Sequence, residues 1–332
     1  MRHAIDVPLS ITRISRRAVL AAALATPGLV RAQQSWPTRP VRLIVPYAPG
    51  GPTDLLGRAL AERLQQAWGQ PVVVENRPGA GSTIGTDYAA RQPADGYTLL
   101  LAATAHVMNP PLMPQLGYDP VRDFTAIVNA AFHPMVLVVH PSVPVHSVAE
   151  FVALAKATPG GLTMGSAGVG NASHLATALF ASVAGIELTH VPFSGAAPAQ
   201  TAILSGQVQG GFLNSTVAVK QIQVGTLRGL AVADAKRWRE LPDLPTLPEL
   251  GFPGVEAVAW YGILAPAGLP PPLVQRLYAD IVAALRQPVM RERILAVGLD
   301  PIEVGPAEFQ AQLATELAKW TKVIHDAGIR PD

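Results

Sequence analysis

The feature that most limits how this chain can fold is a repeated order of an apolar run, a glycine-rich turn and a stretch with helical periodicity. This order starts at Val41 and recurs many times toward the C-terminus. Short apolar runs that alternate with amphipathic helices are typical of α/β proteins, in which helices cover a sheet. With 332 residues, the chain is long enough for two such domains. The sequence therefore predicts an α/β fold with two domains.

The individual elements expected from this pattern are short. Strands are expected at residues 41–45, 72–74, 98–101, 135–139, 162–164, 188–191, 208–212, 229–232 and 260–264. Helices are expected at residues 54–68, 82–91, 147–158, 171–184, 271–286, 289–297 and 306–327. Asp54 is expected to cap the first helix, and its apolar stripe is Leu56, Leu60, Leu64 and Trp68. The proline-rich segment 241–254 is expected to be an ordered connector, because prolines interrupt both strands and helices.

The strand–helix units fall into two sets, which we expect to form two α/β lobes. Residues 33–132 together with residues 258–332 are predicted to form lobe 1, and residues 133–257 are predicted to form lobe 2. The chain is expected to cross between the lobes near Phe132 and Val258.

The first 32 residues have the composition of an export signal. They contain five arginines and one acidic residue, then an apolar run at 18–30, and Val30-Arg31-Ala32 as a cleavage site. Residues 1–32 are therefore expected to be removed. The run from Ser15 to Leu20 contains paired arginines and is typical of a twin-arginine signal, and an ordinary secretory signal is the alternative.

The rest of the chain limits the compartment and the partners. Without residues 1–32 it has 20 basic and 22 acidic residues, so nothing indicates nucleic-acid binding. Cysteine is absent, which excludes disulfides, thiolate metal sites and a lipid anchor at the cleavage point. No apolar run after Ala32 is long enough for a membrane helix. We expect a soluble, exported protein in the periplasm that is not lipid-anchored.

Two glycine-rich loops, each between a strand and a helix, are the candidate binding elements. In the first loop, 46–54, the pair Gly50-Gly51 lets a ligand approach the backbone, and the free amides at a helix start attract an anion. The second loop, 165–171, has the same position in the predicted lobe 2. The first loop can instead be a tight turn that needs glycine only for its dihedral angles. Two anion-binding loops would hold one small organic anion in a cleft between the lobes.

The composition of the two loops indicates which groups would hold the anion. Neither loop contains lysine, so we expect main-chain amides and hydroxyls to hold the anion. Asp54 is expected to orient the amides of the first loop without touching the anion. Arg77 is the one nearby cation, and its alternative is a solvated loop residue. His174 is expected to fix the start of its helix, and Trp260 and Tyr261 are either cleft or core residues.

Patterns that would indicate an enzyme are incomplete. Gly79-Ala80-Gly81 follows a strand, but Ile84 stands where a dinucleotide-binding fingerprint has its third glycine. Ser166 and Ser194 lack the G-x-S-x-G setting of a hydrolase nucleophile, and neither a P-loop nor an H-E-x-x-H motif occurs. We therefore expect no catalytic residue, no cofactor and no bound metal.

Several longer motifs identify a family resemblance. They are VPYAPGGPTD at 45–54, VVVENRPGAG at 72–81, DGYTLL at 95–100, YDP at 118–120, HLA at 174–176, HVPF at 190–193, WYG at 260–262 and APAG at 265–268. In these motifs the chain resembles the receptors of tripartite tricarboxylate transporters, also called Bug-type proteins. The resemblance covers residues 36–332, and the motifs occur in the family's order.

This resemblance implies a periplasmic binding protein of type II, with a ligand cleft between two α/β lobes. Such a receptor binds a small organic anion, a mono-, di- or tricarboxylate, and delivers it to the membrane permease subunits of a tripartite transporter. The ligand-binding residues expected here are Tyr47, Pro49, Gly50, Gly51, Asp54, Ser166, Gly168, Gly170, Asn171 and Phe193. Asn171, Ser194 and Leu213 depart from the family pattern, which usually has a hydroxyl residue, lysine and aspartate there.

The function predicted from all of this is a monomeric solute-binding receptor without catalysis. A receptor that passes its signal to a membrane sensor would need the same ligand cleft and is the alternative. An exported serine hydrolase acting through Ser166 or Ser194 is the remote alternative.

Overall fold

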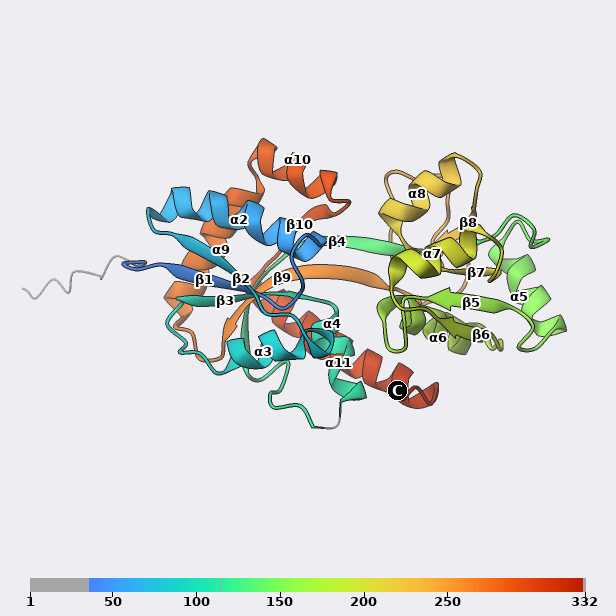
Figure 1. The fold of residues 1–332 in the computed structure, drawn as a ribbon, viewed down its shortest axis with the longest axis horizontal. Coiled ribbons are helices and arrows are strands. Elements are labelled where there is room, and N and C mark those ends of the chain that lie inside the picture. The colour runs from blue at the N-terminus through green and yellow to red at the C-terminus, as the bar shows by residue number, and fades with distance from the viewer. Residues whose placement is uncertain (1–35, 114, 331–332) are drawn as a thin grey trace, which may run out of the picture. The chain divides into compact units, whose positions relative to one another are not determined.

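Strands and helices alternate through residues 36–113 and 115–330, which are the residues that the computed structural model describes. The strands are β1 (Val41–Val45), β2 (Val72–Asn76), β3 (Thr98–Ala103), β4 (Phe124–Val139), β5 (Thr163–Ser166), β6 (Thr189–Pro192), β7 (Gly210–Asn214), β8 (Arg228–Val232), β9 (Val258–Pro266) and β10 (Asp300–Val304). This alternation confirms the predicted α/β fold (Figure 1). The predicted export signal, residues 1–32, lies outside the described residues.

The helices follow the strands in most units. They are α2 (Pro52–Trp68), α3 (Thr83–Ala90), α4 (Ala105–Met108), α5 (Val148–Ala157), α6 (Ala172–Ala184), α7 (Ala196–Leu204), α8 (Ser215–Gln223), α9 (Pro271–Leu285), α10 (Pro288–Ala296) and α11 (Pro306–Asp326). Short 3-10 turns occupy Ala80–Ser82 and Pro110–Leu112.

The sheet has two sections that share the long strand β4. Its order is β2-β1-β3-β9-β4-β7-β5-β6, with β10 and β8 also paired to β4. Residues 124–134 of β4 pair with β9, and residues 129–132 also pair with β10. Residues 135–139 of β4 pair instead with β7 and β8. We call β1–β3, β9, β10 and the first part of β4 the first section, and the remaining strands the second section (Figure 1).

The apolar stripe of α2 is buried as predicted. Leu56, Leu60, Leu64 and Trp68 are all at most 9% exposed, and they face the sheet that contains β1. Burying each such side chain contributes about 1.5–3 kcal/mol. Gly69 ends the helix in the left-handed conformation, with φ of 64°.

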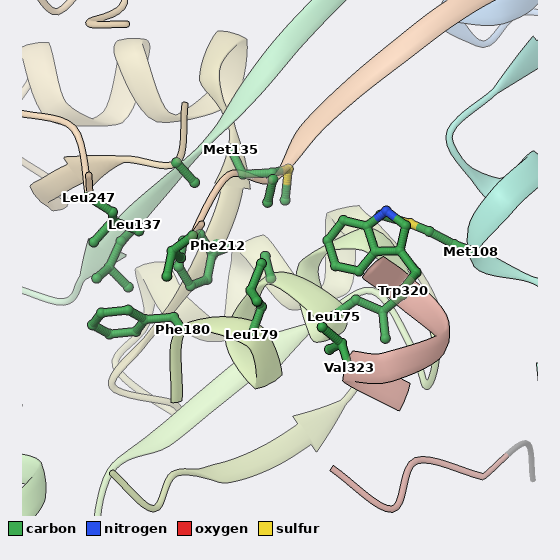
Figure 2. Packing of buried hydrophobic residues seen from close by; sticks show 14 of the residues in the cluster. Met108, Met135, Leu137, Leu175, Leu179, Phe180, Phe212, Leu247, Trp320 and Val323 are labelled. Carbon is green, nitrogen blue, oxygen red and sulfur yellow. The ribbon is translucent and has the colours of Figure 1, made fainter. Parts of the chain in front are cut away.

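Helix α11 links the two sections through its apolar face. Figure 2 shows Trp320 and Val323 of α11 beside Leu175 of α6, which covers the second section. Farther along the same cluster, Phe180 packs edge-on against Phe212 of β7, with ring centroids 6.2 Å apart. The C-terminal helix therefore contributes to the core of both sections.

The structure differs from the sequence prediction at several boundaries. Strand β4 begins at Phe124, eleven residues before the predicted strand 135–139. The prediction missed this first part because Asn129, His133 and Pro134 interrupt the apolar pattern expected of a strand that is buried on both faces. The polar strand β10 was not predicted. Helix α2 begins at Pro52 and not at Asp54, and Gly51 is its N-cap. Proline is favoured at the first helical position, so the prediction of Asp54 as the cap was wrong.

Candidate ligand site

A pocket of about 240 Å³ lies where strand ends from both sections of the sheet meet. We call it the central pocket. Its polar lining residues are Tyr47, Thr53, Thr104, His133, Ser166, Asn171, Ser173, Gln200, Asn214 and Tyr261. Its larger apolar lining residues are Met135, Phe212, Leu213 and Val217, with alanines between them. The position agrees with the rule that α/β sheets bind ligands at the carboxyl ends of their strands.

An adjoining pocket of about 460 Å³ continues the central pocket toward the loops after β1 and β5. The two pockets share Tyr47, Ala105, Ala167, Asn171 and Ala172. Gly170 and Ser82 line only the adjoining pocket. A ligand in the central pocket therefore has a route along the two glycine-rich loops.

Four helix N-termini converge on the central pocket. Thr53 is in the first turn of α2, Asn171 is the N-cap of α6, Ala196 starts α7, and Asn214 is the N-cap of α8, and all of them line the pocket. The first amides of a helix have no partner within it, and the aligned peptide dipoles give that end a partial positive charge. The described lining contains no lysine, arginine, aspartate or glutamate. The pocket therefore attracts an anion without a charged side chain.

The first loop is held by Asp54 from the turn that follows it. Asp54 is 2% exposed, and its Oδ2 accepts the N–H of Gly50 at 2.9 Å and Nε of Arg58 at 3.0 Å. Its Oδ1 accepts Nδ2 of Asn76 at 2.9 Å. Burial raises the pKa of Asp54, but the hydrogen bonds from Arg58, Gly50 and Asn76 together lower it more, so the pKa lies below its ordinary value. Asp54 is therefore a charged anchor.

This anchor changes which amides of the first loop are available. The sequence predicts that main-chain amides of this loop hold the anion, but the structure shows the N–H of Gly50 donating to Asp54. Pro52 has no N–H. The N–H groups of Gly51 and Thr53 do not donate to Asp54 and remain available. Gly50 has φ of 89°, which favours glycine, whereas Gly51 is extended with φ of −80°, and a Cβ there would meet nothing within 4 Å.

Only some of the predicted ligand residues line the two pockets. Tyr47, Ser166 and Asn171 line the central pocket, and Gly170 lines the adjoining one. Pro49, Gly50, Gly51, Asp54, Gly168 and Phe193 line neither of these pockets. Phe193 packs instead against the apolar cluster of the second section.

The second loop is shaped by a helix cap. Asn171 caps α6, because its Oδ1 accepts the N–H of Ser173 at 3.1 Å. The Ser173 hydroxyl donates to the same oxygen and accepts the N–H of Ala167 at 3.0 Å. An asparagine where the family pattern has a hydroxyl residue therefore still provides a cap oxygen.

The titratable side chains of the central pocket are uncharged near neutral pH. Burial raises the pKa of Tyr47 to about 12, although a hydrogen bond with Ser82 partly lowers it. Burial also raises the pKa of Tyr261, whose hydroxyl lies 3.3 Å from Nε2 of His133. Burial lowers the pKa of His133 to about 4. These groups offer hydrogen bonds and no charge.

Arg77 lies outside both pockets. Its guanidinium stacks on the Tyr88 ring at 3.6 Å from the centroid and pairs with Glu75 at 3.2 Å. These contacts give the arginine a structural role at the loop after β2.

Several lining residues were not predicted from the sequence. Thr53 lies in the first turn of α2 and Asn214 at the end of β7, so the rule that placed the two loops also applies to them, whereas Gln200 lies in the second turn of α7. His133 and Met135 belong to the long strand β4, and only the tertiary pairing reveals that they face the pocket. Tyr261, which the sequence left open between cleft and core, does line the pocket.

Within residues 36–113 and 115–330, no helix has the length and apolarity needed to cross a membrane. The same residues contain no cluster of three or more histidine, aspartate or glutamate side chains placed to hold a metal ion.

Comparison with known proteins shows to which family the chain belongs. Residues 56–329 match the tripartite tricarboxylate transporter family receptor. The chain is 34% identical to protein BugT of Bordetella pertussis over 326 residues, which covers 97% of this chain and 99% of that protein.

Two solved structures from Rhodopseudomonas palustris have the same fold. One, with adipate, has a TM-score of 0.73 and 38% identity, and covers 90% of this chain and 100% of that chain. The other, with bound malate, has a TM-score of 0.70 and 31% identity, and covers 87% of this chain and 100% of that chain. The proteins of this family bind solutes and are not enzymes, as the sequence predicted. The chain belongs to the receptor family of the tripartite tricarboxylate transporters and has its periplasmic-binding-protein fold.

Proposed function

We propose that this protein captures a small organic carboxylate between two lobes and delivers it to the permease of a tripartite transporter. The observation that carries the proposal is the convergence of four helix N-termini, from both sections of the sheet, on a pocket whose described lining has no charged side chain. Partial positive charge without a cation suits a carboxylate. The adipate and malate bound by two relatives are carboxylates of this kind.

The size of the pocket supports a small ligand. A volume of about 240 Å³ corresponds to roughly eight waters at 30 Å³ each. This fits a short-chain or single-ring acid. The apolar side chains of Met135, Leu213 and Val217 would contact its carbon skeleton.

The carboxylate would be held mainly by main-chain N–H groups. Those of Gly51 and Thr53 at the start of α2 are free of Asp54, and Ser166, Asn171 and Tyr47 add polar groups. A hydrogen bond to a charged group contributes about 1.5–3 kcal/mol. Two or three such bonds would give a specific but reversible complex.

Closure of the two lobes would place the ligand between both sets of helix starts. We infer that residues 33–132 with 258–332 form one lobe and residues 133–257 the other, joined through β4 and β9. Neighbouring residues of these strands line different pockets: His133, Ala259 and Tyr261 line the central pocket, whereas Phe132, Val258 and Trp260 line a rear pocket of about 920 Å³. Successive strand residues point to opposite faces. Bending at these strands would therefore narrow one pocket and widen the other.

The proposed location is the periplasm, reached by export of a soluble, monomeric chain that is not lipid-anchored. The support is the composition of residues 1–32 and the absence of cysteine. We propose the twin-arginine route. Replacing Arg16 and Arg17 together by lysine should then block export, and normal export of this variant would indicate the ordinary secretory route.

A thermal-shift screen of mono-, di- and tricarboxylates, aromatic acids included, tests the function. A ligand at 100 times its Kd adds about 2.7 kcal/mol of stability, which raises Tm by about 4 °C in a protein of about 300 residues. A rise of this size with at least one acid is the expected result. No shift with any acid, at concentrations up to 10 mM, would contradict the proposed function.

A further inference from the structure

Two histidines stack behind the second glycine-rich loop. The rings of His174 on α6 and His190 on β6 are parallel within 3°, with centroids 3.6 Å apart. Neither ring lines the central or the adjoining pocket. The pair can therefore influence a ligand only through the residues that it contacts.

The first ring holds the end of the loop. The N–H of Gly170 donates to Nδ1 of His174 at 3.1 Å. An acceptor nitrogen carries no proton, so the ring is in the neutral form with its proton on Nε2. Gly170 has φ of 70°, a conformation that favours glycine, and lines the adjoining pocket, so this bond fixes a backbone position at the site.

The second ring holds the start of the loop. Nε2 of His190 lies 2.5 Å from Oγ of Ser166, which lines the central pocket and is 1% exposed. The same hydroxyl accepts the N–H of Gly168 at 3.2 Å. The two imidazoles together therefore tie down Ser166, Gly168 and Gly170.

We propose that His174 and His190 are positioning residues that hold loop 165–171 in its ligand-binding shape, and that they do so fully only while the His174 ring is uncharged. This inference rests on the proposed function, because it takes the loop to be part of the carboxylate site. A proton on Nδ1 of His174 would place N–H against the N–H of Gly170. Two charged rings 3.6 Å apart would also repel each other.

The surroundings of the pair favour the neutral rings. Burial first, and His190 second, lower the pKa of His174 from 6.5 to about 4. Burial lowers the pKa of His190 as well. Helix α6 packs against β5, β7 and α11, and β6 pairs with β5. Strands β5 and β7 carry no ionisable side chain, and β6 carries only His190. None of the ionisable residues of α11 raises the pKa of either histidine; they are Glu308, Glu316, Lys319, Lys322, His325 and Asp326. No described carboxylate therefore compensates a charged ring.

The pair predicts a direction of pH dependence. When the loop is formed, the pKa of His174 is about 4. When the loop opens and exposes the ring, the pKa returns to its ordinary value of 6.5. The formed loop is therefore fully favoured above pH 6.5 and is lost progressively as the pH falls toward about 4. Ligand affinity should be constant from pH 7 to pH 8 and weaker at pH 5.

A first experiment needs no ligand. Nitrogen NMR of the ring atoms in the free wild-type protein should show Nδ1 of His174 unprotonated at pH 7.5. The amide signals of Gly168 and Gly170 should shift together with the ring signals as the pH is lowered toward 4. Titration of His174 near 6.5 without movement of the Gly170 amide would overturn the proposal, whether or not any carboxylate binds.

A second experiment measures the Kd of adipate at pH 7.5 and pH 5 in wild type, His174→Leu and His174→Asn. His174→Leu removes the acceptor, whereas Oδ1 of asparagine can take the place of Nδ1 and does not titrate in this range. We expect wild type to bind between about three- and about thirtyfold more weakly at pH 5, the upper value being the full shift from 6.5 to about 4. His174→Leu should bind about tenfold more weakly at pH 7.5.

The asparagine variant separates positioning from a structural role. His174→Asn should restore most of the affinity at pH 7.5 and keep only the pH dependence that protonation of the adipate carboxyls themselves causes. Equal losses in both variants, or an unchanged pH profile in His174→Asn, would overturn the inference. Failure of wild type to bind any carboxylate at pH 7.5 would instead contradict the proposed function, and the NMR titration would still decide the role of the pair.

Discussion

The carboxylate of Asp54 accepts the N–H of Gly50 at 2.9 Å, so a residue in the first turn of α2 holds the loop that precedes the helix. The same side chain binds Asn76 at the end of β2 and Arg58 one turn along α2. Asp54 therefore acts on the shape of the first loop. Both carboxylate oxygens of Asp54 already accept hydrogen bonds, which hold the side chain away from the ligand.

Replacing Asp54 by alanine should destabilise the fold and weaken binding together. The change leaves the donors of Gly50 and Asn76 without their acceptor, at a cost of about 1–3 kcal/mol in the free energy of unfolding. Urea unfolding measures this cost, and calorimetry measures ligand affinity. Asp54→Asn, which keeps one acceptor oxygen, should fall between wild type and Asp54→Ala, and equal stability of all three proteins would contradict the anchor.

The stability that Asp54 contributes should disappear in acid. Its pKa in the folded chain lies below the ordinary value of 3.8. A lowered carboxyl pKa stabilises the fold above the pKa of the unfolded chain, and this contribution is lost as the pH falls through the folded pKa. The difference in unfolding free energy between wild type and Asp54→Asn should therefore be constant at pH 5–7 and shrink below pH 3.8. A difference that grows in acid would show the opposite sign.

Replacing Gly51 by valine should abolish binding without harming the fold. Gly51 is extended, and a Cβ there meets nothing within 4 Å, so valine fits without a clash. Gly51 itself lines neither pocket, but its side chain would stand beside the N–H groups that we propose hold the carboxylate. The matched control is Gly305→Val, because Gly305 is also an extended N-cap followed by proline, at the start of α11. Both variants should keep their circular dichroism, and only Gly51→Val should lose affinity. Wild-type affinity in Gly51→Val would place the anion elsewhere.

Replacing Tyr47 by phenylalanine tests the side-chain contribution. The hydroxyl remains protonated because its pKa is raised to about 12, so it can donate to the ligand throughout the neutral range. We expect a loss of about 0.5–1.5 kcal/mol, or about two- to tenfold in Kd. Between pH 7 and pH 10, wild-type binding should show no step from this residue. Tyr278→Phe, outside both pockets, is the control, and an equal effect there would contradict a direct role of Tyr47.

The ion pair of Arg239 and Asp300 in the rear pocket should oppose closure. Arg239 follows β8 of the second section, Asp300 begins β10 of the first section, and the two side chains meet at 2.9 Å. If closure widens the rear pocket, it separates this pair. Asp300→Asn should then tighten ligand binding by up to about fivefold, since partly exposed pairs contribute about 0.2–1 kcal/mol.

A second pair on β10 provides the control. Glu303→Gln breaks the ion pair with Arg286, and both partners lie within the first section, so ligand affinity should not change. Small-angle scattering of wild type should also show a smaller radius of gyration with ligand. Weaker binding in Asp300→Asn, or no compaction at saturation, would contradict a hinge at β4 and β9.

Much of this organisation could be predicted from local sequence. The apolar run 41–45, the α2 stripe and the two glycine-rich loops each depend on residues that are close along the chain, and the structure has them at those positions. The course of β4 could not be predicted in this way. Its residues Asn129 and His133 read as polar interruptions, and only pairing with β9 and β10 explains why they are buried in a strand.

The candidate site was predictable to the same extent. Tyr47, Ser166 and Asn171 lie where a strand ends and a helix begins, which a local pattern can indicate. The use of the Gly50 amide by Asp54 depends on side-chain geometry, and the stacking of His174 on His190 joins residues of different elements. Neither contact can be predicted from the spacing of residues along the sequence.

Recognition of a carboxylate group through helix N-termini is the basis of the proposed site. The sharpest test is calorimetric titration of the mature protein with adipate and with adipamide, which has the same carbon chain but no charge, alongside the acid that gives the largest thermal shift and its own amide. At least one acid should bind with a measurable heat in wild type and in Arg77→Ala, because Arg77 is paired with Glu75 outside both pockets. The corresponding amide should bind at least tenfold more weakly, since it loses charge-assisted hydrogen bonds of about 1.5–3 kcal/mol each. Equal affinities for acid and amide, or complete loss of acid binding in Arg77→Ala, would contradict this mode of recognition.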